Sequence, residues 1–255
     1  MSNRLKDKVA FITGGNSGIG FAIAKGFIDE GAKVIILART EQKAQTALSQ
    51  LGEYAEAFIG DVTDLDALKR CYAKIKDAYG KLDIVVANAG IAPITSLSNT
   101  SVSTFDKIMD VNVKGTFFTV QYAMPLLRDG ASVILVSSCL NEMGMEGYSV
   151  YNASKAAIRS LARSMTPDLA RIGARINVLS PGPIKTPVLA NAGMSDEQVD
   201  QMHDLFANVL ASGRSGQPEE MANIATFMAS DDSTFMYGSE IQADGGMNQM
   251  RWPMQ

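Results

Sequence analysis

The stretch Thr13-Gly14-Gly15-Asn16-Ser17-Gly18-Ile19-Gly20 joins two segments of different hydrophobic pattern. Lys8–Thr13 before it is mostly apolar and of strand length, and Phe21–Ile28 after it has the apolar spacing of a helix. A glycine-rich turn between a strand and a helix N-terminus lets backbone N–H groups approach a diphosphate, and the helix dipole favours the negative charge. The order T-G-x-x-x-G-x-G differs from the commoner G-x-G-x-x-G, and glycines alone also form tight turns. The flanking strand and helix favour a phosphate site.

The same order, an apolar strand followed by a helical segment, repeats along the chain. Further strands are expected at Lys33–Leu37, Ala55–Ile59, Ile84–Ala87, Ser132–Val136, Arg175–Leu179 and Glu240–Asp244. Helices are expected at Glu41–Leu51, Leu65–Ala78, Phe105–Arg128 with a break near Gly115, Ala153–Ile172 and Pro218–Ala229. This alternation predicts one doubly wound Rossmann-type α/β domain over residues 1–255, with a central parallel sheet flanked by helices. Residues 188–212 lack a strand signal and are expected to form short helices, a lid over an apolar pocket.

The composition limits the classes of function. Hydrophobic residues make up 46% of the 255 positions, and a net charge of −4 without a basic block argues against a dedicated nucleic-acid binder. The polar segment Met1–Lys8 is unlike a signal peptide, and no apolar run reaches the roughly 20 residues that cross a bilayer, so no membrane association is expected. Cys71 and Cys139 form no disulfide framework, which indicates a reduced cytoplasmic setting. His203 is the only histidine and is expected to be a surface or packing residue, so no metal site is predicted.

The end of the second strand bears on the choice of cofactor. In nucleotide-binding sheets an acidic residue at this place holds the ribose hydroxyls of NAD, and Ala38-Arg39-Thr40 contains none. Arg39 offers a planar cationic fork that suits a 2′-phosphate, and Thr40 adds a hydroxyl donor. The alternative is that Arg39 is a solvated surface charge. The missing acid favours NADP(H) over NAD(H).

Small or rigid residues follow three later strands. Asp61 and Val62 come after the third strand, and Asn88-Ala89-Gly90 after the fourth. The small residues would let a flat ring lie against the backbone, or they form a simple turn. Pro181–Pro187, with three prolines in seven residues, is expected to be a rigid loop at the end of the sixth strand. Ligands of open α/β sheets bind at such carboxyl ends.

A hydroxyl, a phenol and an ammonium group come together after the fifth strand. Tyr151 and Lys155 are four residues apart at the start of a helix, so they share a face. A phenol has a pKa of about 10, and a nearby ammonium is expected to lower it. Ser138 ends the strand, and its loop is expected to bring the hydroxyl back over the helix start, although a solvated helix face also contains such pairs by chance. Asn112 lies in an apolar stretch, where its amide needs partners for a structural bond or a proton relay.

Taken in order, these motifs resemble those of the short-chain dehydrogenase/reductase family along almost the whole chain. The matching residues are Thr13-Gly14-x-x-x-Gly18-x-Gly20, Asp61-Val62, Asn88-Ala89-Gly90, Asn112, Ser138, Tyr151-x-x-x-Lys155 and Pro181-Gly182 with Thr186. Their joint order, with 13 residues from Ser138 to Tyr151, makes the resemblance specific. Ser17 departs from the pattern of many NADP-preferring relatives, which carry a basic residue there. Only Arg39 therefore supports binding of the phosphate.

The resemblance implies a role for each matching residue. Tyr151 would be the general acid for a carbonyl oxygen, and Ser138 would hydrogen-bond that oxygen. Lys155 would lower the tyrosine pKa and bind the nicotinamide ribose, and Asn112 would anchor a water in a proton relay. The implied cofactor-binding residues are Gly14, Asn16, Ser17, Gly18, Ile19, Gly20, Arg39, Thr40, Asp61, Val62, Asn88, Ala89, Gly90, Pro181, Gly182, Ile184 and Thr186, together with Tyr151 and Lys155.

In this family, segments corresponding to Leu140–Val150 and Val188–Ser212 decide the substrate. Here they predict an apolar, adaptable pocket lined by Leu140, Met145, Tyr148, Leu189, Met194 and Phe206. The resemblance also implies a homotetramer, with Phe105–Arg128 and Ala153–Ile172 at one interface. The tail Met247–Gln255, which holds the only tryptophan, is expected to pack on its own subunit or a neighbour.

The leading prediction is an NADPH-dependent reductase of ketones or aldehydes, which in reverse oxidises secondary alcohols. A 3-oxoacyl-[acyl carrier protein] reductase is the alternative within the family. It needs a basic docking surface, for which Arg128, Arg171 and Arg175 are candidates. A cofactor-binding protein without turnover is a third hypothesis, disfavoured because all four catalytic positions are filled.

Overall fold

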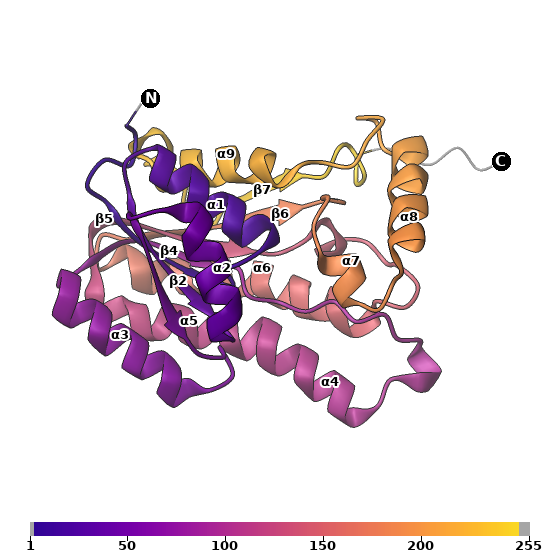
Figure 1. The fold of residues 1–255 in the computed structure, drawn as a ribbon, viewed down its shortest axis with the longest axis horizontal. Helices are drawn as coiled ribbons and strands as arrows, with labels where there is room; N and C mark the ends of the chain where they lie inside the picture. Colours follow the sequence, from indigo (N-terminus) through magenta and orange to yellow (C-terminus); the bar gives the residue numbers. More distant parts are fainter. Residues whose placement is uncertain (1–2, 250–255) are drawn as a thin grey trace.

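The structure, a computed structural model, describes residues 3–249. All seven strands form one parallel sheet in the order β3-β2-β1-β4-β5-β6-β7. The strands are β1 (Val9–Thr13), β2 (Lys33–Ala38), β3 (Ala55–Ile59), β4 (Leu82–Ala87), β5 (Leu127–Val136), β6 (Arg175–Pro181) and β7 (Glu240–Ala243). The α-helices are α1 (Gly18–Asp29), α2 (Glu41–Leu51), α3 (Leu65–Tyr79), α4 (Val102–Met109), α5 (Gly115–Ala123), α6 (Ser149–Ala170), α7 (Val188–Asn191), α8 (Asp196–Val209) and α9 (Pro218–Ala229). Figure 1 shows their arrangement.

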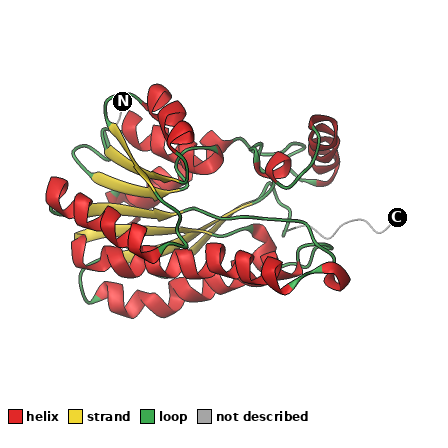
Figure 2. Ribbon diagram, turned by 60° about the horizontal axis from the view of Figure 1, so that its bottom comes forward, coloured by secondary structure: helices red, strands yellow, loops and turns green. Residues whose placement is uncertain are grey.

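Helices cover both faces of the sheet, as Figure 2 shows. Because neighbouring strand residues point to opposite faces, Ala10 and Ile12 join a core with α1, α2 and α9, while Val9 and Phe11 join a second core with α3, α5 and α6. Both faces are therefore apolar, as in parallel sheets covered on each side. The expected doubly wound fold is confirmed.

The carboxyl ends of all the strands lie at one edge of the sheet. Strand order changes direction between β1 and β4, because β2 and β3 lie beyond β1 and the later strands lie beyond β4. Ligands of open α/β sheets bind in the crevice at such a reversal. The segment with α7 and α8 projects from this side of the molecule in Figure 1.

The long helix expected at Phe105–Arg128 is wrong in its bounds, but the expected break near Gly115 is present. Helical structure begins at Val102 and changes to a π-helical turn at Asp110–Lys114 before α5. A Cβ atom on Gly115 would lie 2.7 Å from Val62 Cγ2, so the glycine permits close packing after that turn. Arg128 belongs to β5, which starts at Leu127 rather than Ser132, because Leu127 pairs with Leu82 across the sheet.

The helix expected from Ala153 begins four residues earlier, at Ser149, so that Tyr151 is inside its first turn. Val150 is buried and anchors this first turn. Within residues 3–249, no helix is both long and apolar enough to cross a membrane. The end of the predicted packing tail, including Trp252, lies outside the described residues.

Candidate active site

The glycine-rich turn after β1 is locked to the end of β4. Thr13 Oγ1 accepts hydrogen bonds from the backbone N–H groups of Asn88 and Ala89, both at 3.1 Å. In return, Asn88 Nδ2 donates to the carbonyl oxygens of Thr13 at 3.0 Å and Gly14 at 3.3 Å. The ends of β1 and β4, far apart in sequence, are thus held together at the point where the strand order reverses.

The turn also has the shape that a diphosphate requires. Gly14 and Gly18 have φ angles of +67° and +55°, which side chains disfavour. A Cβ atom on Gly20 would lie 2.4 Å from both Asn88 Nδ2 and the Gly14 carbonyl oxygen, so no side chain fits there. Asn16 lies in the same turn and is half-buried. The residues fit a dinucleotide cofactor whose diphosphate lies against this backbone.

The first turn of α1 is not capped by a side chain. Ser17 is its N-cap residue and makes no side-chain capping bond. By contrast, Thr40, Asp64 and Ser101 each accept backbone N–H bonds at the starts of α2, α3 and α4. The N–H groups at the start of α1, which include those of Ile19 and Gly20, are therefore left for another acceptor.

The residues expected near the adenosine lie along the ends of β2 and β3. Arg39 is exposed directly after β2, and within residues 3–249 no hydrogen bond or ion pair engages its guanidinium group. The Thr40 hydroxyl oxygen accepts from Lys43 N at 3.4 Å, which leaves its hydrogen free to donate. Asp61 Oδ1 accepts from the Thr63 backbone N–H and hydroxyl, at 2.9 and 2.7 Å. Val62 is buried beside it.

The loop after β6 faces the glycine-rich turn. A Cβ atom on Gly18 would be 3.4 Å from Thr186, so the two loops approach each other across the site. Pro181 ends β6, and a Cβ atom on Gly182 would lie 2.5 Å from Asp244 Cα. Ile184 is buried and forms a bridge with Gly216. The structure therefore gathers the expected cofactor residues on two sides of one crevice.

Lys155 is buried beneath this crevice. Its Nζ donates to the Val136 carbonyl oxygen at 3.0 Å. A Cβ atom on Gly90 would be 3.5 Å from Lys155 Nζ and 3.4 Å from Asn112 Oδ1, so the three residues lie together. Burial lowers the pKa of Lys155 from 10.5 to about 8.

Asn112 joins the β4 loop to α6. Its Oδ1 accepts from Ile91 N at 2.9 Å, and its Nδ2 donates to the Ile91 carbonyl oxygen and to Ser154 Oγ, both at 3.0 Å. Ser154 Oγ in turn donates to the Tyr151 carbonyl oxygen at 2.7 Å. The amide is thus fully engaged, and it lies in a π-helical turn, a feature frequent at functional sites. Its function as a water anchor stays a prediction.

Tyr151 and Ser138 lie on the same pocket, as expected from their spacing. Burial raises the pKa of Tyr151 to about 12, and hydrogen bonding to the Ser138 hydroxyl opposes this rise. Lys155 Nζ is 5.6 Å from the centre of the Tyr151 ring. The expected lowering of the Tyr151 pKa by Lys155 is not seen in the protein alone, where burial is the main cause of the shift and the Ser138 hydroxyl is the group that opposes it.

The shifted pKa of Lys155 makes protein stability depend on pH. Between pH 8 and 10.5 the unfolded chain keeps a proton that native Lys155 has released, so the free energy of unfolding rises with pH. We expect the unfolding free energy of the wild type, relative to Lys155→Met, to increase by about 3 kcal/mol across this range. Urea denaturation of both proteins at several pH values measures it. Opposing contributions of Cys71 and Cys139, whose pKa values burial raises to about 12, cancel in the difference. A difference that does not vary with pH would contradict the lowering of the Lys155 pKa by burial.

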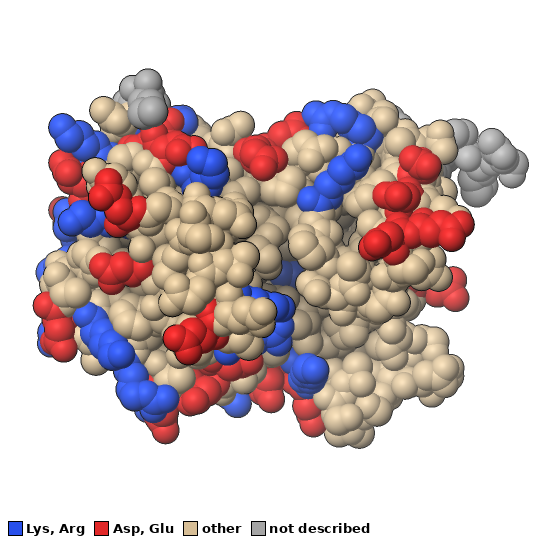
Figure 3. All heavy atoms as spheres, viewed as in Figure 1, with Lys and Arg blue, Asp and Glu red and all other residues tan. Residues whose placement is uncertain are grey.

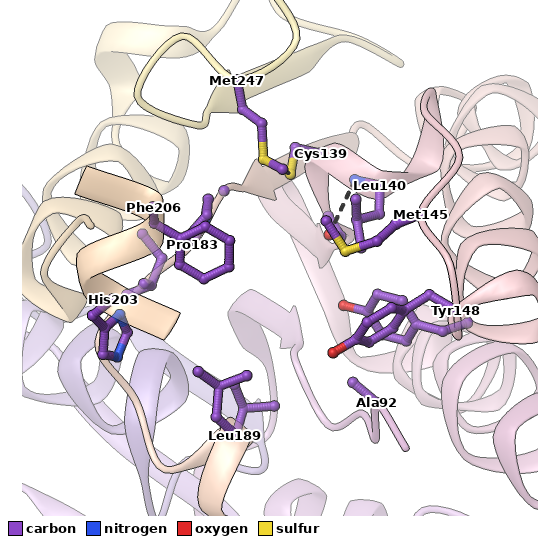
Figure 4. A pocket seen from close by; sticks show the side chains of 15 residues that line it. Ala92, Cys139, Leu140, Met145, Tyr148, Pro183, Leu189, His203, Phe206 and Met247 are labelled. Atoms are coloured by element: carbon purple, nitrogen blue, oxygen red, sulfur yellow. Dashed lines mark hydrogen bonds between the residues drawn. The ribbon is translucent and has the colours of Figure 1, made fainter. Parts of the chain in front are cut away.

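An apolar pocket opens beside Ser138 and Tyr151. Figure 4 shows Leu140, Met145 and Tyr148 on one side, and Leu189 and Phe206 on the other. These five are pocket residues predicted from the sequence. Met194, the sixth, is not among the lining residues. It lies in the link between α7 and α8 and is half-buried there.

Six further lining residues are not among the site residues expected from the sequence: Ala92, Cys139, Pro183, Val188, His203 and Met247. His203 was expected to pack or face solvent, but it lines the pocket, and its Nδ1 is 2.9 Å from Ser215 Oγ. Its spacing of three from Phe206 on one helix could have indicated this. Met247 also lines the pocket, with Sδ 3.7 Å from Cys139 Sγ. Gly245 and Gly246, both with positive φ, turn the chain back to place it there, so this residue of the tail packs on its own subunit, as one of the two expected arrangements has it.

The surface around the site is unevenly charged. Figure 3 shows a hollow between the α1–α2 side and the α7–α8 side, with Lys and Arg side chains along it. Acidic side chains gather over α8, whose sequence contains Asp196, Glu197, Asp200 and Asp204 and no lysine or arginine. Among residues 3–249, no group of three or more His, Cys, Asp or Glu side chains could hold a metal ion.

Known proteins share this arrangement. A family model described as enoyl-(acyl carrier protein) reductase matches residues 14–248. The oxidoreductase asL5 of Sarocladium schorii is 45% identical over 249 residues, covering 97% of this chain and 98% of that protein. The NADP-dependent (R)-specific alcohol dehydrogenase of Lentilactobacillus kefiri is 34% identical over 253 residues, covering 96% and 98%. The solved ligand-free aldohexose dehydrogenase of Thermoplasma acidophilum is 30% identical with a TM-score of 0.89, covering 100% of this chain and 99% of that one. With these matches along its whole length, the chain belongs to the short-chain dehydrogenase/reductase family and is an NAD(P)-dependent oxidoreductase.

Proposed function

We propose that this protein is an NADPH-dependent reductase that converts a ketone or aldehyde into an alcohol, and that it catalyses the reverse oxidation. The observation that supports this most is the convergence of Ser138 and Tyr151 on one apolar pocket, with Lys155 buried close by. The glycine-rich turn, with positive φ at Gly14 and Gly18 and no room for a side chain at Gly20, supports binding of the cofactor diphosphate against its backbone. When bound, the nicotinamide supplies or accepts the hydride.

Ser138, Tyr151 and Lys155 together carry out the proton transfer to the substrate oxygen. The Ser138 hydroxyl donates a hydrogen bond to the substrate oxygen and orients it. The Tyr151 hydroxyl donates its proton to the same oxygen as negative charge develops there. The Tyr151 phenol is protonated at neutral pH, as an acid that donates during reduction must be. The cationic form of Lys155 stabilises the phenolate that results.

Arg39 supports the preference for NADPH. It is exposed at the end of β2, and neither Ala38 nor Thr40 beside it can accept from ribose hydroxyls as a carboxylate would. A guanidinium group binds a phosphate through paired hydrogen bonds. The relative from Lentilactobacillus kefiri is named as NADP-dependent, which agrees with this proposal.

The substrate is proposed to be a small, mainly apolar carbonyl compound. Leu140, Met145, Leu189 and Phe206 line the pocket, and methionine adapts its shape to varied ligands. Residues 188–212 supply Leu189, His203 and Phe206 to its wall, which supports their assignment as a lid.

A rate panel tests the proposal. Oxidation of NADPH and of NADH is measured with simple ketones, aryl ketones, diketones, aldehydes and a 3-oxoacyl thioester. We expect turnover of free carbonyl compounds with preference for NADPH. Binding of NADPH without turnover of any compound would contradict a reductase function.

The structure gives little support to the 3-oxoacyl-[acyl carrier protein] alternative. Arg128 and Arg175 lie at the amino ends of β5 and β6, the opposite edge of the sheet from the pocket. Arg175 is buried and donates to the carbonyl oxygens of Met228 and Ser230 at 2.6 Å, and Arg171 pairs with Asp168. These three arginines therefore do not form the basic docking surface that a 3-oxoacyl-[acyl carrier protein] reductase needs. The acidic α8 beside the pocket would also repel an acidic carrier.

We further propose a homotetramer in which α4, α5 and α6 contribute to an interface. Val102 and Phe105 at the start of α4 are 78% and 46% exposed, and Ile172 after α6 is 39% exposed, so apolar surface is available on α4 and beyond the end of α6. Sedimentation equilibrium is expected to give four times the 27.3 kDa chain mass. A monomer at micromolar concentration would contradict the assembly.

A cytoplasmic location is proposed as well, supported by the two free buried cysteines, and cell fractionation tests it.

A further inference from the structure

A ring of hydrogen bonds stands behind the turn that carries Ser138. This turn, Ser138–Asn141, follows β5 directly. Asn141 Nδ2 donates to a carboxylate oxygen of Glu240, and it lies 3.3 Å from both Ser137 Oγ and Ser180 Oγ. Ser137 Oγ in turn donates to the Lys155 carbonyl oxygen at 2.9 Å. The Ser138 turn is therefore fastened to three neighbouring elements, β6, β7 and α6.

Glu240, the first residue of the outermost strand β7, is the centre of this ring. Its side chain is only 9% exposed, and its Oε1 accepts from both Asn141 Nδ2 and the Ser180 hydroxyl. Its Oε2 accepts from Arg159 Nε at 2.8 Å. Arg159 Nη1 donates to the Gly238 carbonyl oxygen at 2.9 Å, which fixes the orientation of the guanidinium plane.

Arg159 carries the connection back to the catalytic helix. Tyr151, Lys155 and Arg159 follow one another at intervals of four on α6, so they lie along one side of it. The ring thus runs from the Ser138 turn through Glu240 and Arg159 to α6, and returns through the Lys155 carbonyl oxygen and Ser137. It ties together the two elements whose side chains meet at the substrate oxygen.

The free-energy cost of burying the ion pair between Arg159 and Glu240 indicates that the ring has a function other than stabilising the fold. A buried ion pair loses hydration, and replacement by apolar residues of similar volume is often neutral or stabilising. Directional bonds to a carboxylate, in contrast, fix the distance between the groups that they join. In this ring, that distance is the one between Ser138 and Tyr151.

We infer that Glu240, held by Arg159, is a positioning residue that sets the Ser138 hydroxyl against Tyr151 through Asn141. This inference rests on the proposed carbonyl reduction. Because a shift of about 1 Å at a reacting centre can lower a rate by roughly 100-fold, loss of the ring is expected to lower kcat. The affinity for the cofactor is expected to remain nearly unchanged, because the ring includes no residue of the glycine-rich turn.

Three variants test the inference. Glu240→Gln keeps the shape of the side chain but removes the charge, and the double variant Arg159→Met with Glu240→Leu replaces the ion pair by apolar side chains. Asp168→Asn is the matched control, because it removes an exposed ion pair with Arg171 on the same helix. Thermal unfolding, kcat, KM and the Kd for NADPH are measured for each.

We expect Glu240→Gln to lower kcat by 10- to 100-fold with the Kd for NADPH within threefold of the wild type, and Asp168→Asn to change neither. The double variant is expected to have a Tm close to that of the wild type, while its kcat stays at least 10-fold below the wild-type value. Recovery of kcat together with Tm would overturn the inference, since the ring would then serve stability alone. If the wild type itself reduces no carbonyl compound, the proposed function fails and the inference falls with it. An active wild type with an equally active double variant refutes only the inference.

Discussion

Substitution of Tyr151 by phenylalanine is expected to lower kcat for carbonyl reduction by about 1,000-fold, within the range for loss of a general acid. The phenyl ring retains the edge-to-face contact with Tyr148, whose ring centre is 5.8 Å away, so the fold should be preserved. The Kd for NADPH is expected to change less than about threefold, because the diphosphate lies against the glycine-rich turn. Rates under saturating NADPH and fluorescence titration of the cofactor measure the two quantities.

Tyr148→Phe is the matched control for this substitution. Tyr148 also lines the pocket and carries a hydroxyl, but it precedes the first turn of α6. Its loss should reduce kcat/KM by less than about 10-fold, as expected for one substrate hydrogen bond. If Tyr148→Phe abolished reduction and Tyr151→Phe left it intact, the acid would be Tyr148 and the proposed proton transfer would be wrong.

Substitution of Arg39 by aspartate is expected to reverse the cofactor preference. A charge-assisted bond to a phosphate contributes about 1.5–3 kcal/mol, and a carboxylate there would repel the 2′-phosphate and accept from ribose hydroxyls instead. We expect the ratio of kcat/KM for NADPH to that for NADH to fall by about 1,000-fold. Steady-state rates with both cofactors measure this ratio.

Arg39→Gln separates the two causes of that change. Without the positive charge, kcat/KM for NADPH should fall by about 10- to 100-fold, whereas NADH should gain nothing because no carboxylate is present. An unchanged NADPH preference in both variants would mean that Arg39 is a solvated surface charge. The cofactor assignment would then need another phosphate-binding group.

The fold could be predicted because its signals are local. β1, β2 and β4 are mainly apolar runs, and β3, α2 and α9 have the bounds expected from the sequence. The start of β5 could not be predicted, because Arg128, Asp129 and Gly130 resemble a turn. Pairing of Leu127 with Leu82 extends the strand through them. The break in the helix near Gly115 was expected, but the sequence did not show that it is a π-helical turn.

The site was predictable to the extent that its residues are near one another in sequence or form known motifs. The glycine-rich turn, Asn112, Ser138, Tyr151 and Lys155 all meet around one crevice. The pKa of Tyr151 could not be read from its spacing to Lys155, because desolvation depends on residues from several elements. The bond between Arg159 and Glu240 joins positions 81 residues apart, and an acid at the start of a short strand gives no sign of burial.

The uncapped start of α1 links folding to the supply of nucleotide. A helix end without a capping side chain forgoes about 1 kcal/mol, and a phosphate bound at those N–H groups restores a comparable amount. By mass action, a ligand at a hundred times its Kd stabilises the native state by about 2.7 kcal/mol. The share of chains open to proteases in a cell would therefore fall as the nucleotide pool rises. Because Ser17 makes no capping bond, nucleotide bound at this helix end would supply a stabilising contact that a capping side chain supplies elsewhere.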